Sequence, residues 1–436
     1  MIHADDSRWY GGFSGGNAPD SVVEAVLSHD GVLYVGGWFQ IAGGNTAHYV
    51  AAWDGTDWAS LGQGMDDYVF DLAMFDGSLV AAGRFDTADG QVCNGVARWT
   101  ESGWEPMGTG FDADVVALCE FQGELYAAGH FLHANEVTAN HIAKWNGEGW
   151  APLSVEQPND RVWCLVAHDG SLYVGGTFTA IGDAPEGYVA RWDGENWHGL
   201  GGGVNNYVHS LTVYGDDVVA GGRFSIAGGE AINRVAGWTG TTWRAFGPGL
   251  NERPYTVHGV GDKLYAGGVF TNAGGTSASH VAVWDGVAWA AMGSGTDGPV
   301  SDFANDDAFV YCGGNFLQAG NQPSLYLGRW SRFAPADTES QIASARTLAL
   351  LPPAPNPFSE GVLRYFIASP SPAELHVLDV MGRSRRTLVD STVDAGWSTI
   401  SWDGTSDDGS RLPAGVYFLR LSARGVGMVT EKITIR

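Results

Sequence analysis

LYVGGWF, at residues 33–39, is the stretch that decides the fold, because close variants of it recur along most of the chain. Each copy ends in a Phe, and consecutive copies lie 46 or 47 residues apart. A period of this length is typical of the blades of a β-propeller. We call these residues the repeat Phe; they are Phe39, Phe85, Phe131, Phe178, Phe224, Phe270 and Phe316.

Each repeat is predicted to form four strands. In the first repeat they cover about residues 22–28, 32–39, 48–53 and 57–61, separated by turns rich in Asp-Gly. Gly accepts the positive φ that such tight turns require. A Trp stands fourteen residues after each repeat Phe, and a second Trp follows five residues later in six repeats. These large side chains are expected to fill the space between neighbouring sheets.

The seventh repeat lacks its second Trp, because Trp330 leads directly into a different sequence. At the other end of the chain, Trp9 precedes the first repeat in the way that the other second Trps precede theirs. An N-terminal strand that completes the last sheet removes open sheet edges and locks a ring. The sequence therefore predicts an all-β protein in which residues 1–333 form a seven-bladed β-propeller.

The double Gly and the two Trps resemble the kelch and galactose-oxidase-like propellers. They are more similar still to bacterial extracellular repeats of the form LYVGGxFxxAGG…VAxWDGxxW. The resemblance covers residues 9–333 and implies the fold, whereas propellers host many functions. The copper-ligand constellation of galactose oxidase has no counterpart in this sequence, so we expect neither a metal site nor a cofactor.

The C-terminal part differs in composition from the repeats. Residues 334–350 are small and polar at first and are interpreted as a linker. Residues 351–436 are predicted to form a small Ig-like β-sandwich. The strand-like runs lie at 362–367, 373–380, 397–402, 415–421 and 429–435.

This C-terminal domain resembles the Ig-like domain of flagellar hook-capping proteins and the C-terminal sorting domain of the type IX secretion system. The similar stretches are PNPF at 355–358, LDVMGR at 378–383, WDG at 402–404, GVYF at 415–418 and EKITIR at 431–436. The resemblance implies export, the secretion machinery as a partner, and an extracellular or cell-surface location. A plain stalk or docking domain is the alternative. The start, MIHADDSRWY, has no apolar stretch, which predicts a trimmed chain or one that is not exported.

Charge and hydropathy exclude two classes of partner. The net charge is −26, from 23 basic and 49 acidic residues, and residues 347–436 hold nine of each sign. So acidic a surface repels phosphate backbones, and nucleic acid is not expected to bind. No apolar run approaches the roughly 20 residues of a membrane span, so membrane insertion is not expected either.

Several smaller motifs favour structural roles. Cys93, Cys119, Cys164 and Cys312 have no paired spacing and are predicted to be buried free thiols. The acidic stretch at residues 403–409 misplaces the Gly of a calcium loop and is interpreted as a hairpin turn. The sequence has no GxSxG, Walker or HExxH motif.

An Asp or Asn stands nineteen residues before each repeat Phe. We interpret it as a cap of its own turn, with a ring of cation ligands at the channel mouth as the alternative. These residues are Asp20, Asp66, Asp112, Asn159, Asn205, Asn251 and Asp297.

The variable residues of the inner strands are the best candidates for a binding site. In four repeats, the residues two and four positions after this Asp or Asn are aromatic, Arg or His. These positions have the same parity along the strand, so their side chains are expected near one mouth of the central channel. Aromatic faces with hydrogen-bonding tips suit sugar rings or peptide side chains. Packing that plugs the channel is the alternative. The predicted ligand-binding residues are Tyr68, Phe70, Arg161, Trp163, Tyr207, His209, Arg253 and Tyr255.

The leading hypothesis is a non-catalytic, exported binding or adhesion protein that recognises a glycan or a protein at this mouth. A second hypothesis is a filament subunit, in which the acidic propeller contacts Arg383, Arg385 and Arg386 of the next copy. A polysaccharide-active enzyme that uses a carboxylate pair is the third.

Overall fold

The structure is a computed structural model that describes residues 6–182, 184–185, 187–332, 348–351, 361–367, 369–380, 382–424 and 427–435. The chain divides into two compact units, Met1–Arg332 and Phe333–Arg436. Apart from one 3-10 turn, η1 (Asp6–Arg8), every named element of the described residues is a β-strand. None of the described residues forms a helix long and apolar enough to cross a membrane.

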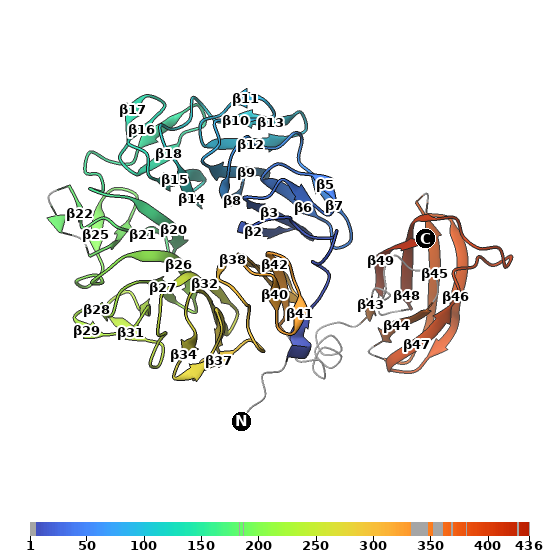
Figure 1. The fold of residues 1–436 in the computed structure, drawn as a ribbon. Coiled ribbons are helices and arrows are strands. Elements are labelled where there is room, and N and C mark those ends of the chain that lie inside the picture. The colour runs from blue at the N-terminus through green and yellow to red at the C-terminus, as the bar shows by residue number, and fades with distance from the viewer. Residues whose placement is uncertain are drawn as a thin grey trace. The chain divides into compact units, whose positions relative to one another are not determined.

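The first unit contains seven four-stranded antiparallel sheets (Figure 1). Each is named here by its innermost strand. The innermost strands are β2 (Val23–His29), β8 (Val69–Phe75), β14 (Val115–Phe121), β20 (Val162–His168), β26 (Val208–Tyr214), β32 (Pro254–Val260) and β38 (Val300–Asn305). The second strands are β3 (Val32–Gly37), β9 (Ser78–Gly83), β15 (Glu124–Gly129), β21 (Ser171–Gly176), β27 (Asp217–Gly222), β33 (Lys263–Gly268) and β39 (Phe309–Gly314).

The outer half of each sheet carries the paired Trps. The third strands are β6 (Val50–Trp53), β12 (Val96–Thr100), β18 (Ile142–Trp145), β24 (Val189–Trp192), β30 (Val235–Trp238), β36 (Val281–Trp284) and β42 (Leu327–Ser331). The outermost strands are β7 (Trp58–Ser60), β13 (Gly103–Pro106), β19 (Trp150–Pro152), β25 (Trp197–Gly199), β31 (Trp243–Ala245), β37 (Trp289–Ala291) and β1 (Trp9–Tyr10).

The innermost strands contact one another in a closed circle. Each of β2, β8, β14, β20, β26, β32 and β38 touches the next, and β38 touches β2. The N-terminal strand completes the last sheet, as the sequence predicts, because β1 pairs with β42. Trp9 faces Trp330 there in the same register in which Trp58 faces Trp53. The two ends of the unit are thus joined within one sheet.

A short two-stranded hairpin follows the second strand of every sheet. The hairpins are β4 (Ile41–Ala42) with β5 (Asn45–Thr46), β10 (Thr87–Ala88) with β11 (Gln91–Val92), β16 (His133–Ala134) with β17 (Val137–Thr138), β22 (Ala180–Ile181) with β23 (Ala184–Pro185), β28 (Ile226–Ala227) with β29 (Glu230–Ala231), β34 (Asn272–Ala273) with β35 (Thr276–Ser277), and β40 (Gln318–Ala319) with β41 (Gln322–Pro323).

The repeated Asp or Asn anchors this hairpin. The prediction that it caps its own turn was wrong, because its side chain accepts hydrogen bonds from the hairpin instead. Asp20 Oδ1 accepts the main-chain N–H groups of Gln40 and Ile41. The other six make the same two bonds with the residues 20 and 21 positions onward. Each side chain therefore ties the start of an inner strand to a distant loop of its own sheet.

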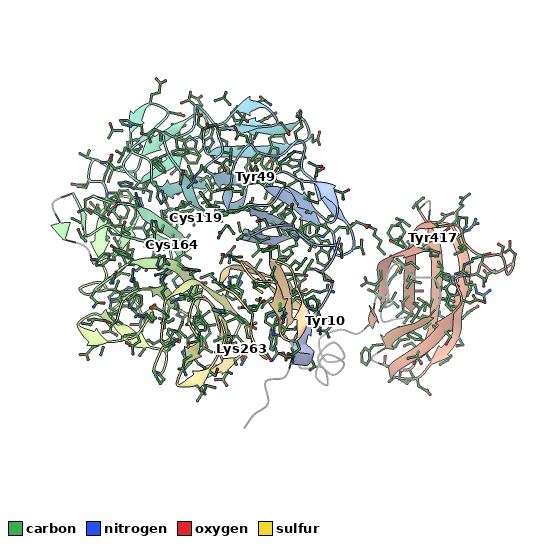
Figure 2. The ribbon with its side chains drawn as sticks, in the orientation of Figure 1. Tyr10, Tyr49, Cys119, Cys164, Lys263 and Tyr417 are labelled. Carbon is green, nitrogen blue, oxygen red and sulfur yellow. The ribbon has the colours of Figure 1, made fainter. Side chains whose placement is uncertain are left out.

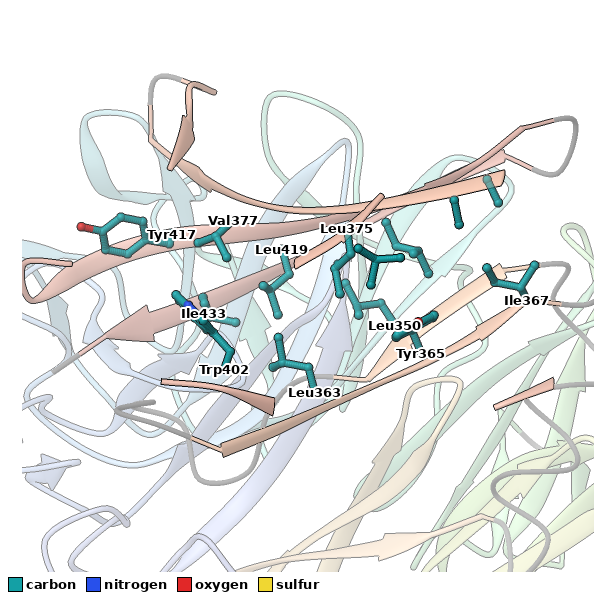
Figure 3. Close-up of a cluster of buried hydrophobic side chains, with 14 of the residues drawn as sticks. Leu350, Leu363, Tyr365, Ile367, Leu375, Val377, Trp402, Tyr417, Leu419 and Ile433 are labelled. Carbon is teal, nitrogen blue, oxygen red and sulfur yellow. The ribbon is translucent and has the colours of Figure 1, made fainter. Parts of the chain in front are cut away.

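The second unit consists of two antiparallel sheets. The first holds β43 (Leu348–Leu351), β44 (Gly361–Ile367) and β47 (Gly396–Trp402). The second holds β46 (Ser384–Val393), β45 (Ser371–Asp379), β48 (Gly415–Ala423) and β49 (Gly427–Ile435). Leu363 and Trp402 of the first sheet share one buried core with Leu375, Leu419 and Ile433 of the second (Figure 3).

Two details of this unit differ from the sequence-based expectation. The predicted linker ends at residue 350, but β43 already begins at Leu348. The strand β46 was missed, because its Arg, Thr, Asp and Ser residues interrupt the apolar pattern that marks a strand. The PNPF stretch at residues 355–358 and residues 334–347 of the linker lie outside the described residues.

All four cysteines are free, as predicted, and Cys119 and Cys164 lie on neighbouring inner strands (Figure 2). Cys93, Cys164 and Cys312 are buried, whereas Cys119 is only partly buried, contrary to expectation. Burial raises the pKa of the Cys119 thiol to about 12. A thiol with so high a pKa is protonated, and therefore poorly reactive, at neutral pH.

Candidate functional site

Every innermost strand of the first unit carries a β-bulge near its start. In β8, for example, the register shifts between Val69 and Asp71, which leaves Phe70 as the extra residue. A bulge re-aims a side chain, and here it directs one residue per sheet to the same place. All seven bulged residues line one cavity of about 220 Å³, and they are Glu24, Phe70, Val116, Trp163, His209, Tyr255 and Ser301.

One group of rings lies on the β20, β26 and β32 side of this cavity. The Trp163 ring stacks on His209, with centroids 4.6 Å apart. Tyr255 meets His209 edge-on at 6.0 Å, and Tyr207 meets Trp163 edge-on at 5.8 Å. We call these four residues the Trp163 cluster. The indole N–H of Trp163 is buried and has no hydrogen-bond partner among the described residues.

A second group of rings comes from the β2 and β8 sheets. Trp38 stacks on Tyr68 with centroids 4.6 Å apart and an angle of 10° between the planes. Phe70 and Tyr49 meet Tyr68 edge-on at 6.5 and 5.7 Å. The Arg84 guanidinium lies 5.6 Å from the centre of the Tyr68 ring. Trp38 is 42% exposed, so this group, which we call the Tyr68 cluster, presents an aromatic face to solvent.

Arginines accompany the Trp163 cluster. The Arg253 guanidinium lies 5.3 Å from the Tyr255 ring centre, and its Nη2 donates to the Tyr255 hydroxyl at 3.3 Å. Burial, together with Arg253 and Arg223, lowers the pKa of His209 to about 4. His209 is therefore neutral at physiological pH and acts as an aromatic ring rather than as a cation.

Two carboxylates near the axis connect neighbouring inner strands. Asp71 Oδ2 accepts the main-chain N–H of Leu118 at 2.6 Å, and Asp302 Oδ2 accepts that of Val26 at 2.9 Å. Burial raises the pKa of Asp71 to about 7 and that of Asp302 to about 8. Burial also raises the pKa of Glu24. These acids fasten one sheet to the next and line the same cavity as the rings.

The structure brings most of the predicted binding residues together. Phe70, Trp163, His209 and Tyr255 line the cavity, and Tyr68, Tyr207 and Arg253 contact them. Arg161 is exposed, two residues before Trp163. That these side chains bind a ligand stays a prediction.

Sequence reasoning missed Trp38, Arg84 and Arg223, each of which directly precedes a repeat Phe. A spacing of 30 residues could have revealed them, because it joins Trp38 to Tyr68 and Arg84 to Asp114, two pairs that contact in the structure.

Comparisons with known proteins agree with the fold. A family model described as a β-propeller domain of unknown function, DUF5122, matches residues 76–103. The chain contains a β-propeller. The curated proteins that were compared include no match.

Three solved structures illustrate how distant the structural relatives are. PorZ, a surface component of the type IX secretion system of Porphyromonas gingivalis, is 12% identical, with a TM-score of 0.45; the match covers 96% of this chain and 60% of PorZ. Acylaminoacyl peptidase from Pyrococcus horikoshii is 11% identical, with a TM-score of 0.41 and coverage of 81% and 59%. AztD from Citrobacter koseri is 9% identical, with a TM-score of 0.34 and coverage of 90% and 98%.

The arginines proposed for assembly are partly engaged within their own unit. Arg383 Nε donates to Asp379 Oδ2 at 2.9 Å. Arg386 Nη1 donates to the main-chain oxygen of Ser406 at 2.9 Å. Arg385 is exposed. Two of the three side chains are therefore held by local partners, which weakens the basis for a filament contact.

The acidic stretch at residues 403–409 also uses its own carboxylates. Asp403 Oδ1 accepts the N–H and hydroxyl groups of Thr405, and Asp408 Oδ1 accepts bonds from Ser406 and Ser410. These bonds lower the pKa of Asp403 and of Asp408. Within the described part of the chain, no group of three or more His, Cys, Asp or Glu residues could hold a metal ion. The local bonds agree with the hairpin-turn interpretation.

Proposed function

We propose that this chain is a non-catalytic recognition protein whose seven-bladed propeller binds a glycan at the aromatic mouth. The Ig-like second unit then serves as the sorting or anchoring domain of an exported, cell-surface protein. This location rests on the resemblance of its sequence motifs to secretion sorting domains.

The convergence of rings on one cavity carries the proposal. The β8, β20, β26 and β32 sheets each bring one aromatic side chain to this cavity, and Tyr68 and Tyr207 contact two of these rings. Aromatic faces pack against the apolar face of a ring ligand, while Tyr and Trp tips supply hydrogen bonds.

A role in polysaccharide cleavage has less support. Its general acid would have to come from the axis carboxylates, whose raised pKa values are otherwise suited to such chemistry. Asp71, however, uses both oxygens for main-chain N–H groups, those of Leu72 and Leu118. A carboxylate committed to two structural bonds is poorly placed to exchange protons with a substrate.

The test is a panel of glycans and peptides presented to the native chain and to a Trp163→Ala/Tyr255→Ala variant. We expect glycans among the ligands and at least about tenfold weaker binding by the variant, because it lacks both ring surfaces. Tyr10→Ala is the matched control, since Tyr10 is 38% exposed on the outermost strand β1 and lies outside both clusters. Glycan binding unchanged in a folded double variant contradicts the assigned site, and binding of peptides alone contradicts the ligand class.

A further inference from the structure

Neighbouring sheets meet at the mouth through one recurring pair of side chains. The first member directly precedes the repeat Phe of one sheet, and the second stands seventeen residues before the repeat Phe of the next. Within each sheet, the main-chain N–H of the residue before the repeat Phe donates to the main-chain oxygen of the residue seventeen positions before that same Phe, for example from Arg84 to Tyr68, which holds both positions close to the ring of inner strands. We call the two side chains from neighbouring sheets a junction pair.

Two junction pairs are complementary. Trp38 and Tyr68 form the first, with their rings stacked at 4.6 Å. Arg84 and Asp114 form the second, an ion pair with Arg84 Nη2 at 3.2 Å from Asp114 Oδ2. His130 Nδ1 lies 3.5 Å from the same carboxylate. This junction shows that the position accepts a carboxylate held by an arginine.

The junction between the β26 and β32 sheets breaks the pattern, because Arg223 and Arg253 occupy its two positions. Both guanidiniums lie near enough to His209 to disfavour its protonation. Among the described residues, neither forms an ion pair. Glu252, next in sequence to Arg253, is paired with Arg234. The Arg253 Nε is buried and also lacks a partner.

This arrangement is unusual for so acidic a unit. Residues 1–332 contain 13 basic and 38 acidic residues, a net charge of 13 − 38 = −25. In a unit with almost three times as many acidic as basic residues, two arginines at one junction with no carboxylate of the described residues paired to either are unexpected. Like charges repel at close range, and an anion placed between them reverses that repulsion.

We propose that Arg223 and Arg253 bind the carboxylate of an acidic sugar, a hexuronate residue that stacks on the Trp163 cluster. The ligand carboxylate supplies to Arg223 and Arg253 the opposite charge that Asp114 supplies to Arg84. Arginine matches a carboxylate with two parallel N–H groups, which gives both strength and orientation. The inference rests on the proposed function and specifies the class of ligand that binds at the same mouth.

A sugar carboxylate fits this site better than the C-terminus of a peptide. Proteins typically capture a chain terminus with main-chain N–H groups, whereas the donors here are side-chain guanidiniums. The adjoining surface consists of Trp163, Tyr207, His209 and Tyr255, whose rings can stack on a sugar. The net charge of −25 disfavours a dense polyanion, so we expect one recognised carboxylate rather than a run of them.

The test compares a glucuronate-terminated disaccharide with its glucose-terminated counterpart by calorimetry. We expect the native chain to bind the acidic sugar at least about tenfold more tightly, because the glucose-terminated disaccharide cannot form the charge-assisted hydrogen bonds with the two arginines. Arg223→Gln and Arg253→Gln should each abolish most of this preference. Arg98→Gln is the control and should retain it, because Arg98 belongs to the outer strand β12 and pairs with Glu105.

A fourth variant separates binding from folding. Arg253→Asp places a carboxylate opposite Arg223, as Asp114 lies opposite Arg84. We expect its melting temperature to equal or exceed that of the native chain, while the preference for the acidic sugar disappears. A folded Arg253→Asp variant that keeps the preference overturns the proposal.

Three other outcomes of this experiment would overturn the inference, and they show whether the proposed function fails with it. If the native chain binds both sugars equally and binding still requires Trp163, the acidic-sugar inference fails while the proposed function stands. If a peptide with a free C-terminus binds more tightly than either sugar and requires Arg223, the sugar assignment fails. If no sugar or peptide of the panel binds, the proposed function and the inference fail together.

Discussion

The indole N–H of Trp9 donates to the main-chain oxygen of Met292 at 2.8 Å, although 283 residues separate them. Four other outermost-strand tryptophans make the corresponding bond to the preceding sheet, at 2.7–3.0 Å. The N-terminal segment thus reproduces at the closure the contact that joins consecutive sheets elsewhere. Trp58 is different, because its indole N–H has no partner among the described residues.

This difference predicts that Trp9→Phe and Trp58→Phe lower the free energy of unfolding by unequal amounts. Trp9→Phe removes part of the ring and a buried hydrogen bond, whereas the Met292 carbonyl keeps the bond that it accepts from the Gly295 N–H. Trp58→Phe removes the ring edge alone. We expect Trp9→Phe to lower the free energy of unfolding by about 0.5–1.5 kcal/mol more than Trp58→Phe. Urea denaturation of both variants measures the difference, and equal losses would show that the closing bond adds no stability.

The hydrogen bonds that the repeated Asp and Asn side chains accept from the hairpins predict a structural role for these residues rather than a metal-binding one. Asn205 Oδ1 accepts the N–H groups of Ser225 and Ile226 at 2.8 and 3.0 Å. Asn205→Ala removes both bonds and is expected to cost about 2 kcal/mol. Asn205→Asp retains the accepting oxygen and should cost less than half as much. Melting temperatures that respond to calcium or to a chelator would instead favour the cation ring.

The axis carboxylates predict a loss of stability as the pH rises from about 4 to about 8. The pKa values of Asp71 and Asp302, about 7 and 8, lie above the value of 3.8 for an unperturbed Asp. Between the unperturbed value and these raised values, the folded state therefore holds more protons than the unfolded state, and its stability falls as pH rises over that range. Asp302→Asn removes one of these titrations. We expect a smaller decrease in the free energy of unfolding between pH 6 and pH 9 in this variant, and an unchanged decrease would refute the assignment.

His209 predicts the opposite slope at acidic pH. Its pKa of about 4 lies below the value of 6.5 for an unperturbed His. The unfolded state gains a proton first, so this group lowers stability as pH falls from about 6.5 to about 4. An NMR titration should show a neutral His209 imidazole at pH 5.5. A midpoint near 6.5 would mean that neither burial nor the two arginines affect the ring.

The repeat explains why so much of the fold could be predicted. Each repeat Phe and its two Trps mark equivalent strands, and Trp9 marks the missing one by the same rule. The spacing within the repeat also predicted that Trp163, His209 and Tyr255 lie near one another, although β-bulges rather than strand parity direct them into the cavity. The partners of those residues could not be inferred in the same way, because the spacing describes one sheet, whereas Arg223 follows β27 of one sheet and Arg253 precedes β32 of the next.

Local turn chemistry misled the interpretation of the repeated Asp and Asn for a related reason. Asp and Asn often bond to their own turn, so the nearest partner was assumed. Yet Asn159, Asn205 and Asn251 each have a hydroxyl partner 20 residues onward, in Thr179, Ser225 and Thr271. Where Asp replaces Asn, the residue at that distance is Gln40, Asp86, Leu132 or Leu317. That pairing of residue types was present in the sequence.

The central claim is that the mouth recognises a ligand through the Trp163 cluster, and the most direct measurement is the indole N–H resonance of Trp163. We would assign it by comparison with a Trp163→Phe variant and titrate with the glucuronate-terminated disaccharide. The account predicts that this resonance shifts and saturates, because the sugar ring stacks on the Trp163 indole, while that of Trp104, whose N–H donates to the main-chain oxygen of Leu61, stays in place. Saturable binding that leaves the Trp163 resonance unmoved would contradict it.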